Sequence, residues 1–182
     1  SALQQALKYL QSQYAFDWII DVGANIGDFS KQARRFFPKS KIVAFEPLDQ
    51  CCKIINETFV SDDQFSLVSK AVGEKEGQIQ FNVNQHADSS SILNTLELHN
   101  NTFSFASATT STKVKVTTLD VELKKKNIKK GLLKLDIQGY EDRAIQGGQQ
   151  ILPGFQVVIC EINFADMYKD QATFATIHDL LS

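Results

Sequence analysis

The sequence predicts an α/β fold in which a mostly parallel sheet carries helices on both of its faces. Short apolar runs typical of buried strands alternate with amphipathic segments typical of helices through the first part of the chain. A glycine-bearing turn follows the first apolar run, and acidic residues end several others. The 182 residues, 43% hydrophobic and 22% charged, are enough for one domain with a real core.

A strand, a turn and the start of a helix organise the N-terminal part of the chain. The run Trp18–Val22 suits a strand that is covered on both faces. Gly23 and Gly27 allow a sharp turn and a close approach of a ligand to the backbone. Asp28 and Ser30 mark a helix start, whose unpaired N–H groups favour an anionic ligand group. Such a unit is typical of nucleotide-binding α/β domains.

The other elements follow from the periodicity of the apolar residues. Helical spacing predicts helices at residues 3–14, 28–37, 48–59, 120–130, 140–152 and 171–181. Apolar or alternating runs predict further strands at 41–46, 65–72, 77–83, 113–119, 132–137 and 156–162. The β-α-β-α-β order of the first half predicts parallel strands with right-handed crossovers.

The region around residues 77–119 interrupts this order. The segments 77–83 and 113–119 alternate apolar and polar residues, which predicts a hairpin-like insertion. The segment 84–112 between them is rich in Ser, Thr and Asn and is too long for a simple turn, so we expect a functional or mobile loop. His86 and His99 lie in this loop, either solvated or as a mobile base.

Composition argues against several other classes of protein. A net charge of −2 is unlike that of a general nucleic-acid binder. Cys51, Cys52 and Cys160 do not form a disulfide framework and suit a reduced, cytoplasmic protein. No apolar run is long enough to span a membrane, and no secretory signal is recognisable. We also expect no metal, because no Cys/His cluster has ligand spacing.

Three acidic residues stand where a ligand crevice is expected. Glu46 ends the second strand and Asp136 the strand after the insertion, and ligands bind beyond the carboxyl ends of parallel strands. The carboxylate of Glu46 can accept hydrogen bonds from both ribose hydroxyls of an adenosine. Asp21, two residues before Gly23, can either hold an ammonium group or brace the backbone of the turn.

The turn favours one class of cofactor over another. Asn25 stands where the dinucleotide fingerprint has its second glycine, although Asn tolerates a positive φ. An acid at position 21 is unusual for a dinucleotide site. S-adenosylmethionine carries both an ammonium group and an adenosine, whereas nicotinamide cofactors lack the ammonium. An NAD(P)-dependent oxidoreductase is therefore the alternative enzyme.

Four motifs together resemble the FkbM family of S-adenosylmethionine-dependent methyltransferases: Asp21-Val-Gly-Ala-Asn-Ile-Gly27, Phe45-Glu-Pro47, Ala71-Val-Gly73 and Leu133-Lys-Leu-Asp-Ile-Gln-Gly-Tyr-Glu141. The resemblance implies a Rossmann-like class I methyltransferase fold. It also implies O-methylation of a hydroxyl on a small molecule, namely a sugar, a glycan or a natural product. A non-catalytic binding or scaffold domain with the same fold is the non-enzyme alternative.

The resemblance also assigns roles to residues of this chain. It places the methionine part of the cofactor at Asp21, Gly23, Asn25 and Gly27, the ribose at Glu46, and the adenine near Ala71 and Val72. Asp136 is the first candidate for the base or for orienting the acceptor hydroxyl, with binding of the cofactor's ammonium as the alternative. Glu141 is the second candidate, with stabilisation of a helix N-terminus as its alternative. Substrate contacts are expected from Ser90, Ser91 and Gln138.

Two departures from the family pattern stand out. Gln138 replaces a glutamate of many relatives, and an amide can donate and accept hydrogen bonds but cannot act as a general base. The class I sheet usually ends with two more strands, and this chain reaches Ser182 before either. We therefore expect a single S-adenosylmethionine-binding domain over residues 1–182, either C-terminally truncated, a short form, or a homodimer that covers the exposed edge.

Overall fold

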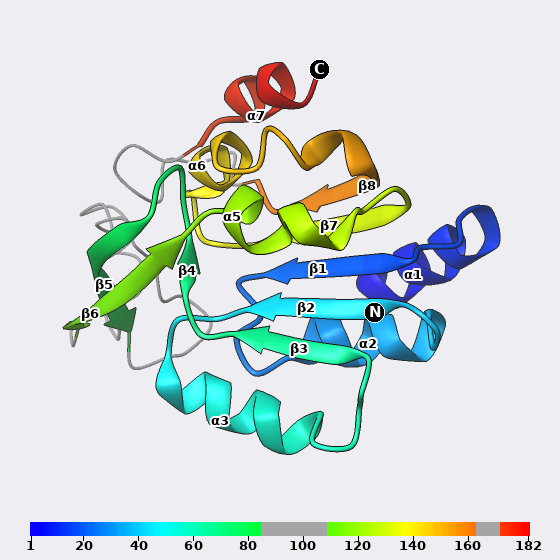
Figure 1. The fold of residues 1–182 in the computed structure, drawn as a ribbon, viewed down its shortest axis with the longest axis horizontal. Helices are drawn as coiled ribbons and strands as arrows, with labels where there is room; N and C mark the ends of the chain where they lie inside the picture. Colours follow the sequence, from blue (N-terminus) through cyan, green and yellow to red (C-terminus); the bar gives the residue numbers. More distant parts are fainter. Residues whose placement is uncertain (85–108, 163–171) are drawn as a thin grey trace.

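A five-stranded parallel sheet forms the centre of the protein, with its strands in the order β3-β2-β1-β7-β8 (Figure 1). All four neighbouring pairs are parallel, as the alternation of strands and helices predicts. The structure is a computed structural model that describes residues 1–84, 109–162 and 172–182. The strands are β1 (Trp18–Val22), β2 (Lys41–Phe45), β3 (Phe65–Val68), β7 (Gly131–Leu135) and β8 (Phe155–Cys160).

Helices cover both faces of this sheet. Ile19 of β1 packs in a cluster with residues of the first two helices, whereas its neighbour Ile20 packs with residues of the last three. This alternation follows from the two-residue period of a strand, and it explains why the central strands are apolar throughout. One face carries α1 (Ala2–Gln13), α2 (Asp28–Phe36) and α3 (Asp49–Thr58), and the other carries α5 (Leu119–Leu123), α6 (Glu141–Gln146) and α7 (Phe174–Leu181).

A second, three-stranded sheet lies beside the first and confirms the hairpin-like insertion. Its order is β4-β6-β5, with β5 and β6 antiparallel and β4 parallel to β6. The strands are β4 (Ala71–Val72), β5 (Gly77–Asn84) and β6 (Thr109–Thr117). In Figure 1 this sheet stands at the side toward which the strands of the central sheet point.

The single strand predicted over residues 65–72 is wrong, because the chain changes sheets within it. After β3, the N–H of Lys70 donates to the carbonyl of Val68 over 2.8 Å and turns the backbone. The chain then continues as β4 and pairs with β6. The apolar residues on either side of the break keep the same pattern, so periodicity alone does not reveal it.

Three other predicted boundaries are wrong for local reasons. The strand predicted at 113–119 ends at Thr117, because the side chain of Thr118 accepts from the N–H of Val121 and begins α5. The helix predicted at 120–130 ends as α5 at Leu123, with a 3₁₀ turn over Lys124–Lys126. The helix predicted at 140–152 ends at Gln146, before two adjacent glycines.

The loop expected at 84–112 is described only where it belongs to β5 and β6. His86, Ser90, Ser91 and His99 lie outside the described residues. Within the described ranges, β8 pairs with β7 on one side and no strand pairs with its other side. No helix in these same ranges is long and apolar enough to cross a membrane.

Candidate functional site

The turn after β1 has the strained geometry that its glycines predict. Gly23, Asn25 and Gly27 adopt positive φ angles of 77°, 50° and 83°. A Cβ atom on Gly23 would lie 1.9 Å from the backbone oxygen of Asp136, so only glycine fits between the ends of β1 and β7. Gly27 is the N-cap of α2. The N–H groups of Gly23, Ala24, Asn25 and Gly27 donate within the protein, so the turn itself is fixed and brings the N-terminus of α2 to the carboxyl edge of the sheet.

Glu46 lies beside this turn and is held by it. Its Oε2 accepts from the N–H of Asn25 and its Oε1 from the N–H of Leu48, each over 2.9 Å. The side chain is only 5% exposed. Burial raises the pKa of Glu46 to about 7, against the lowering effect of the two backbone hydrogen bonds. Each carboxylate oxygen has a second lone pair, so the group can still accept from a ligand hydroxyl.

This raised pKa makes a prediction for the pH dependence of stability. Folded Glu46 keeps its proton up to pH about 7, whereas an unfolded glutamate loses it near 4.5. Between these values folded Glu46 binds more protons, so its contribution to stability is fully present below pH 4.5 and is lost as the pH rises through about 7, by on the order of 3 kcal/mol. Urea unfolding at pH 5 and pH 8 measures the change. We expect Glu46→Gln to remove this contribution and so to show a smaller pH dependence than the native protein, and exposed Glu57→Gln to keep it; equal pH dependence in all three proteins would contradict the assignment.

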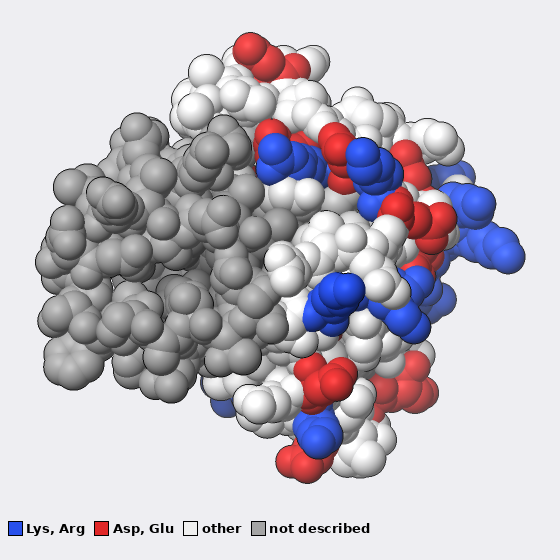
Figure 2. Space-filling model, turned by 90° about the vertical axis from the view of Figure 1, so that its left-hand side faces the viewer, with Lys and Arg blue, Asp and Glu red and all other residues white. Residues whose placement is uncertain are grey.

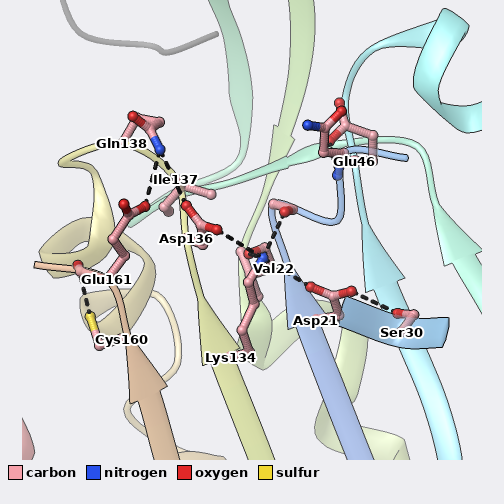
Figure 3. Close-up of polar contacts among 12 residues, drawn as sticks. Asp21, Val22, Ser30, Glu46, Lys134, Asp136, Ile137, Gln138, Cys160 and Glu161 are labelled. Atoms are coloured by element: carbon pink, nitrogen blue, oxygen red, sulfur yellow. Dashed lines mark hydrogen bonds and ion pairs between the residues drawn. The ribbon is translucent and has the colours of Figure 1, made fainter. Parts of the chain in front are cut away.

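A buried lysine, which the sequence did not identify as a site residue, connects two of the predicted acids (Figure 3). The Nζ atom of Lys134 lies 3.1 Å from Oδ1 of Asp21 and 3.5 Å from Oδ2 of Asp136. It also donates to the carbonyl oxygen of Gly23 over 2.8 Å. The other oxygen of Asp21 accepts from the hydroxyl of Ser30 over 2.6 Å. We refer to Asp21, Lys134 and Asp136 as the ion triad.

The contacts of the ion triad support one of the two roles considered for Asp21. The side chain of Asp21 is 0% exposed. Burial acts to lower the pKa of Lys134, but the carboxylates of Asp21 and Asp136 outweigh it and hold this pKa above its ordinary value. Lys134 is therefore a fixed cation bonded to the turn. Asp21 braces the turn through Lys134 and Ser30, and the cofactor contact expected of it stays a prediction.

The register of the strands explains how Lys134 was missed and how it could have been found. Asp21 and Lys134 face each other as neighbours on β1 and β7. A lysine inside the apolar run Leu132–Leu135 is rarely buried unless it is paired. The lysine within this apolar run was therefore the feature of the sequence that predicts a buried, paired cation.

A second acid that the sequence did not single out meets Asp136 at the end of β8. The amide nitrogen of Gln138 donates to Oδ1 of Asp136 over 3.3 Å and to Oε2 of Glu161 over 3.1 Å (Figure 3). A hydrogen bond from Glu161 and the charge of Lys134 overcome burial and lower the pKa of Asp136. The hydrogen bond to Asp136, together with burial, raises the pKa of Glu161 to about 8. Glu161 directly follows an apolar strand, as Glu46 does, and this position in the sequence could have identified it as a site residue.

Lys134, Asp136 and Glu161 border a cavity of about 380 Å³ at the carboxyl ends of β1, β7 and β8, whereas Glu46, Gly27 and Gln138 are not among its lining residues. Of the predicted residues, Gly23, Asn25 and Asp136 line it. Asp28 at the start of α2 also lines it. The cavity is bordered in addition by Leu3, Ala24, Ile26, Phe29, Lys134, Leu135, Ile159, Cys160 and Glu161.

Other predicted residues lie away from this cavity. Glu141 is 2% exposed, and its Oε1 accepts from the N–H of Ile137 over 2.9 Å, so it braces the loop before α6. Burial raises the pKa of Glu141, but its position does not suit a base acting on a ligand. Ala71 and Val72 are buried in β4 of the second sheet, whereas the sequence placed them at the end of a strand of the central sheet. The adenine contact expected of them stays a prediction.

The cysteines and the surface charges give no second site. Burial is the main cause of raised pKa values for the thiols of Cys51, Cys52 and Cys160. On the face shown in Figure 2, positive and negative side chains of the described residues are interspersed. Across the described ranges, no group of three or more His, Cys, Asp or Glu residues is arranged to hold a metal ion.

Comparisons of sequence agree on one family. The family model of the methyltransferase FkbM domain matches residues 21–182. The 2-O-methyltransferase NoeI of Sinorhizobium fredii (strain NBRC 101917 / NGR234) is 23% identical over 170 residues, which cover 90% of this chain and 70% of NoeI. The methyltransferase sdnD of Sordaria araneosa is 41% identical over 49 residues, or 27% of this chain and 19% of sdnD.

Comparisons of structure show a shared fold. The methyltransferase FkbM of Methylobacillus flagellatus KT superposes with a TM-score of 0.51 and 14% identity, over 76% of this chain. A putative O-methyltransferase of Nostoc punctiforme PCC 73102 superposes with a TM-score of 0.50 and 10% identity, over 99% of this chain. The chain spans 31% and 48% of the lengths of these two structures.

Proposed function

This chain belongs to the FkbM methyltransferase domain family, and from that membership we propose that it uses S-adenosylmethionine to methylate a hydroxyl group. The proposed acceptor is a sugar, a glycan or a natural product. The printed name of the relative NoeI, a 2-O-methyltransferase, supports oxygen as the acceptor atom. The observation that carries the proposal is the glycine turn bonded to a buried acid at the end of β2, because adenosine cofactors of α/β sheets bind at such an edge.

The residues at this edge fit the parts of the cofactor. The N-terminus of α2, which the turn positions, offers N–H groups for the carboxylate of its methionine part. Glu46 offers lone pairs to the two ribose hydroxyls. Asp136 and Glu161 border the cavity and offer negative charge toward the ammonium and sulfonium groups. The bound cofactor supplies an activated methyl carbon.

The chain's part in the reaction is to position groups and remove a proton. The N-terminus of α2 and Glu46 would hold the cofactor, and the cavity walls would position the acceptor hydroxyl next to it. Lys134 holds Asp136 as an anion near the reacting atoms. A carboxylate of the cavity accepts the proton of the acceptor hydroxyl. We expect the hydrophobic wall residues to keep water away from this step.

Calorimetry with S-adenosylhomocysteine tests the cofactor assignment. We expect heat of binding for the native protein and an affinity about tenfold to a hundredfold lower for Glu46→Ala, because hydrogen bonds to a charged group are lost. Glu57→Ala, a change at an exposed glutamate of α3, is the matched control and should bind normally.

Two results would contradict the proposal. Absence of binding heat at millimolar S-adenosylhomocysteine would remove the cofactor assignment, and unchanged affinity in Glu46→Ala would remove Glu46 from the ribose site. A fluorescence titration with NADH run alongside identifies the oxidoreductase alternative. Circular dichroism of Glu46→Ala shows whether the variant keeps its fold.

A further inference from the structure

Glu161 stands out among the cavity residues because it is an acid with which no cation of the described residues forms an ion pair. It follows β8 directly, and its N–H donates to the carbonyl of Leu135, which ties it to the end of β7. Its side chain receives the amide hydrogen bond of Gln138 and a hydrogen-bonding contact with Asp136. By contrast, Asp136 is paired with Lys134. Two neighbouring carboxyl groups thus have different electrostatic surroundings.

Such a difference separates the roles of two acids. A carboxylate paired with a lysine is a weak base, because the cation stabilises its ionised form. A carboxyl group beside that fixed anion holds its proton more strongly and is the stronger base once ionised. Among the described residues, the charged and titratable groups around Glu161 are Lys134 of β7, Asp136 directly after β7, Glu141 of α6 and Cys160 of β8. Lys134 is the one cation among these four.

We propose that Glu161, rather than Asp136, accepts the proton of the acceptor hydroxyl, and that Asp136 acts as the fixed anion that makes Glu161 a strong enough base. This inference deepens the proposed function and rests on it. The acceptor oxygen forms the new O–C bond with its own electron pair, and the S–C bond breaks with its electron pair left on sulfur. The hydroxyl proton passes to a carboxylate oxygen of Glu161, so the charge of the sulfonium and that of the carboxylate are both neutralised.

The positions of the other acids support this assignment. Glu141 is buried and bonded to the backbone of Ile137, away from the cavity. Gln138 cannot accept a proton at neutral pH, but its amide nitrogen orients both carboxyl groups. Both Asp136 and Glu161 border the cavity, so geometry alone leaves either in reach of an acceptor. They differ in that Asp136 forms an ion pair with Lys134, which makes Asp136 the weaker base of the two.

The first test is a titration that needs neither cofactor nor acceptor. Carbon-13 NMR of protein labelled at the glutamate side-chain carboxyl follows each glutamate with pH, and the signal missing from Glu161→Gln identifies Glu161. We expect a midpoint near pH 8 for Glu161. In Asp136→Asn the midpoint should move down toward the ordinary glutamate value, about 4.3. An ordinary midpoint in the native protein, or no shift in Asp136→Asn, would overturn the proposal. Exposed Glu57, identified through Glu57→Gln, is the internal control.

The second test is methyl transfer from tritiated S-adenosylmethionine to a mixed pool of oligosaccharides between pH 6 and pH 9. At saturating S-adenosylmethionine, Glu161→Gln should lose about 10²- to 10⁴-fold in rate, the range for a positioned general base. In Asp136→Asn, the pH at which the rate levels off should move down with the Glu161 titration. More than a tenth of the native rate in Glu161→Gln would overturn the inference and leave the proposed function intact. Absence of cofactor binding by the native protein would instead overturn the proposed function. If no oligosaccharide of the pool is methylated, the NMR titration alone decides for or against Glu161.

Discussion

Replacing Gly23 by alanine is expected to destabilise the protein by at least about 3 kcal/mol and to abolish binding of S-adenosylhomocysteine. The new Cβ would lie 1.9 Å from the backbone oxygen of Asp136, and that oxygen belongs to the main chain and cannot swing away. The φ of 77° adds a further cost for a residue with a side chain. Urea unfolding and calorimetry measure the two effects.

The same chain provides graded controls for this change. At Gly27 the φ is 83° but the nearest atom to a new Cβ is 3.3 Å away, so alanine there should cost only the backbone strain of about 1–2 kcal/mol. At Gly77 nothing lies within 4 Å, so alanine should change stability by less than about 0.5 kcal/mol. A Gly23→Ala protein as stable as Gly77→Ala would show that the turn is not clamped against β7.

Replacing Lys134 by methionine is expected to cost about 3–5 kcal/mol at neutral pH. Methionine keeps much of the side-chain volume, but it leaves the carboxylate of Asp21 buried without its cation. Urea unfolding at neutral pH measures this loss.

The double variant Asp21→Asn with Lys134→Met separates charge from packing. With both partners neutral, part of the lost stability should return. Lys53→Met, at an exposed position of α3, is the matched control and should stay within about 0.5 kcal/mol of the native protein. A loss below about 1 kcal/mol for Lys134→Met would mean that the ion triad does not hold the turn.

Sequence periodicity predicted the central sheet well, because its signal is local. The apolar runs at Trp18–Val22 and Lys41–Phe45 and the glycines between them fix a strand, a turn and a helix within a few residues. The break at Ser69 and Lys70 was not visible, since it depends on a hydrogen bond and on pairing with β6, more than forty residues further along the chain. Thr118 is a typical helix N-cap residue, but the alternating pattern of β6 continues through it, so the strand was predicted to extend too far.

For the site, the sequence identified where the acids stand but not which residues pair with them. Glu46 and Asp136 were predicted from their places at strand ends, and both lie at the expected edge. The sequence did not show that Asp21 is paired with Lys134, because the two residues are 113 positions apart and become neighbours only through the pairing of β1 with β7. Glu161 was overlooked for a related reason. Its distinctive chemistry comes from Asp136 across two neighbouring strands, which no linear pattern encodes.

The bond from Lys134 to Gly23 has a consequence for the order of folding. The cofactor turn looks like a local structure, yet its backbone is held by Lys134 of β7, more than a hundred residues later, and Gly23 packs closely against the backbone of Asp136. Contacts this far apart close large loops and form late. We therefore expect the first strands and helices to assemble before the turn takes its final shape. The protein would then become able to bind the cofactor only after β7 has paired with β1.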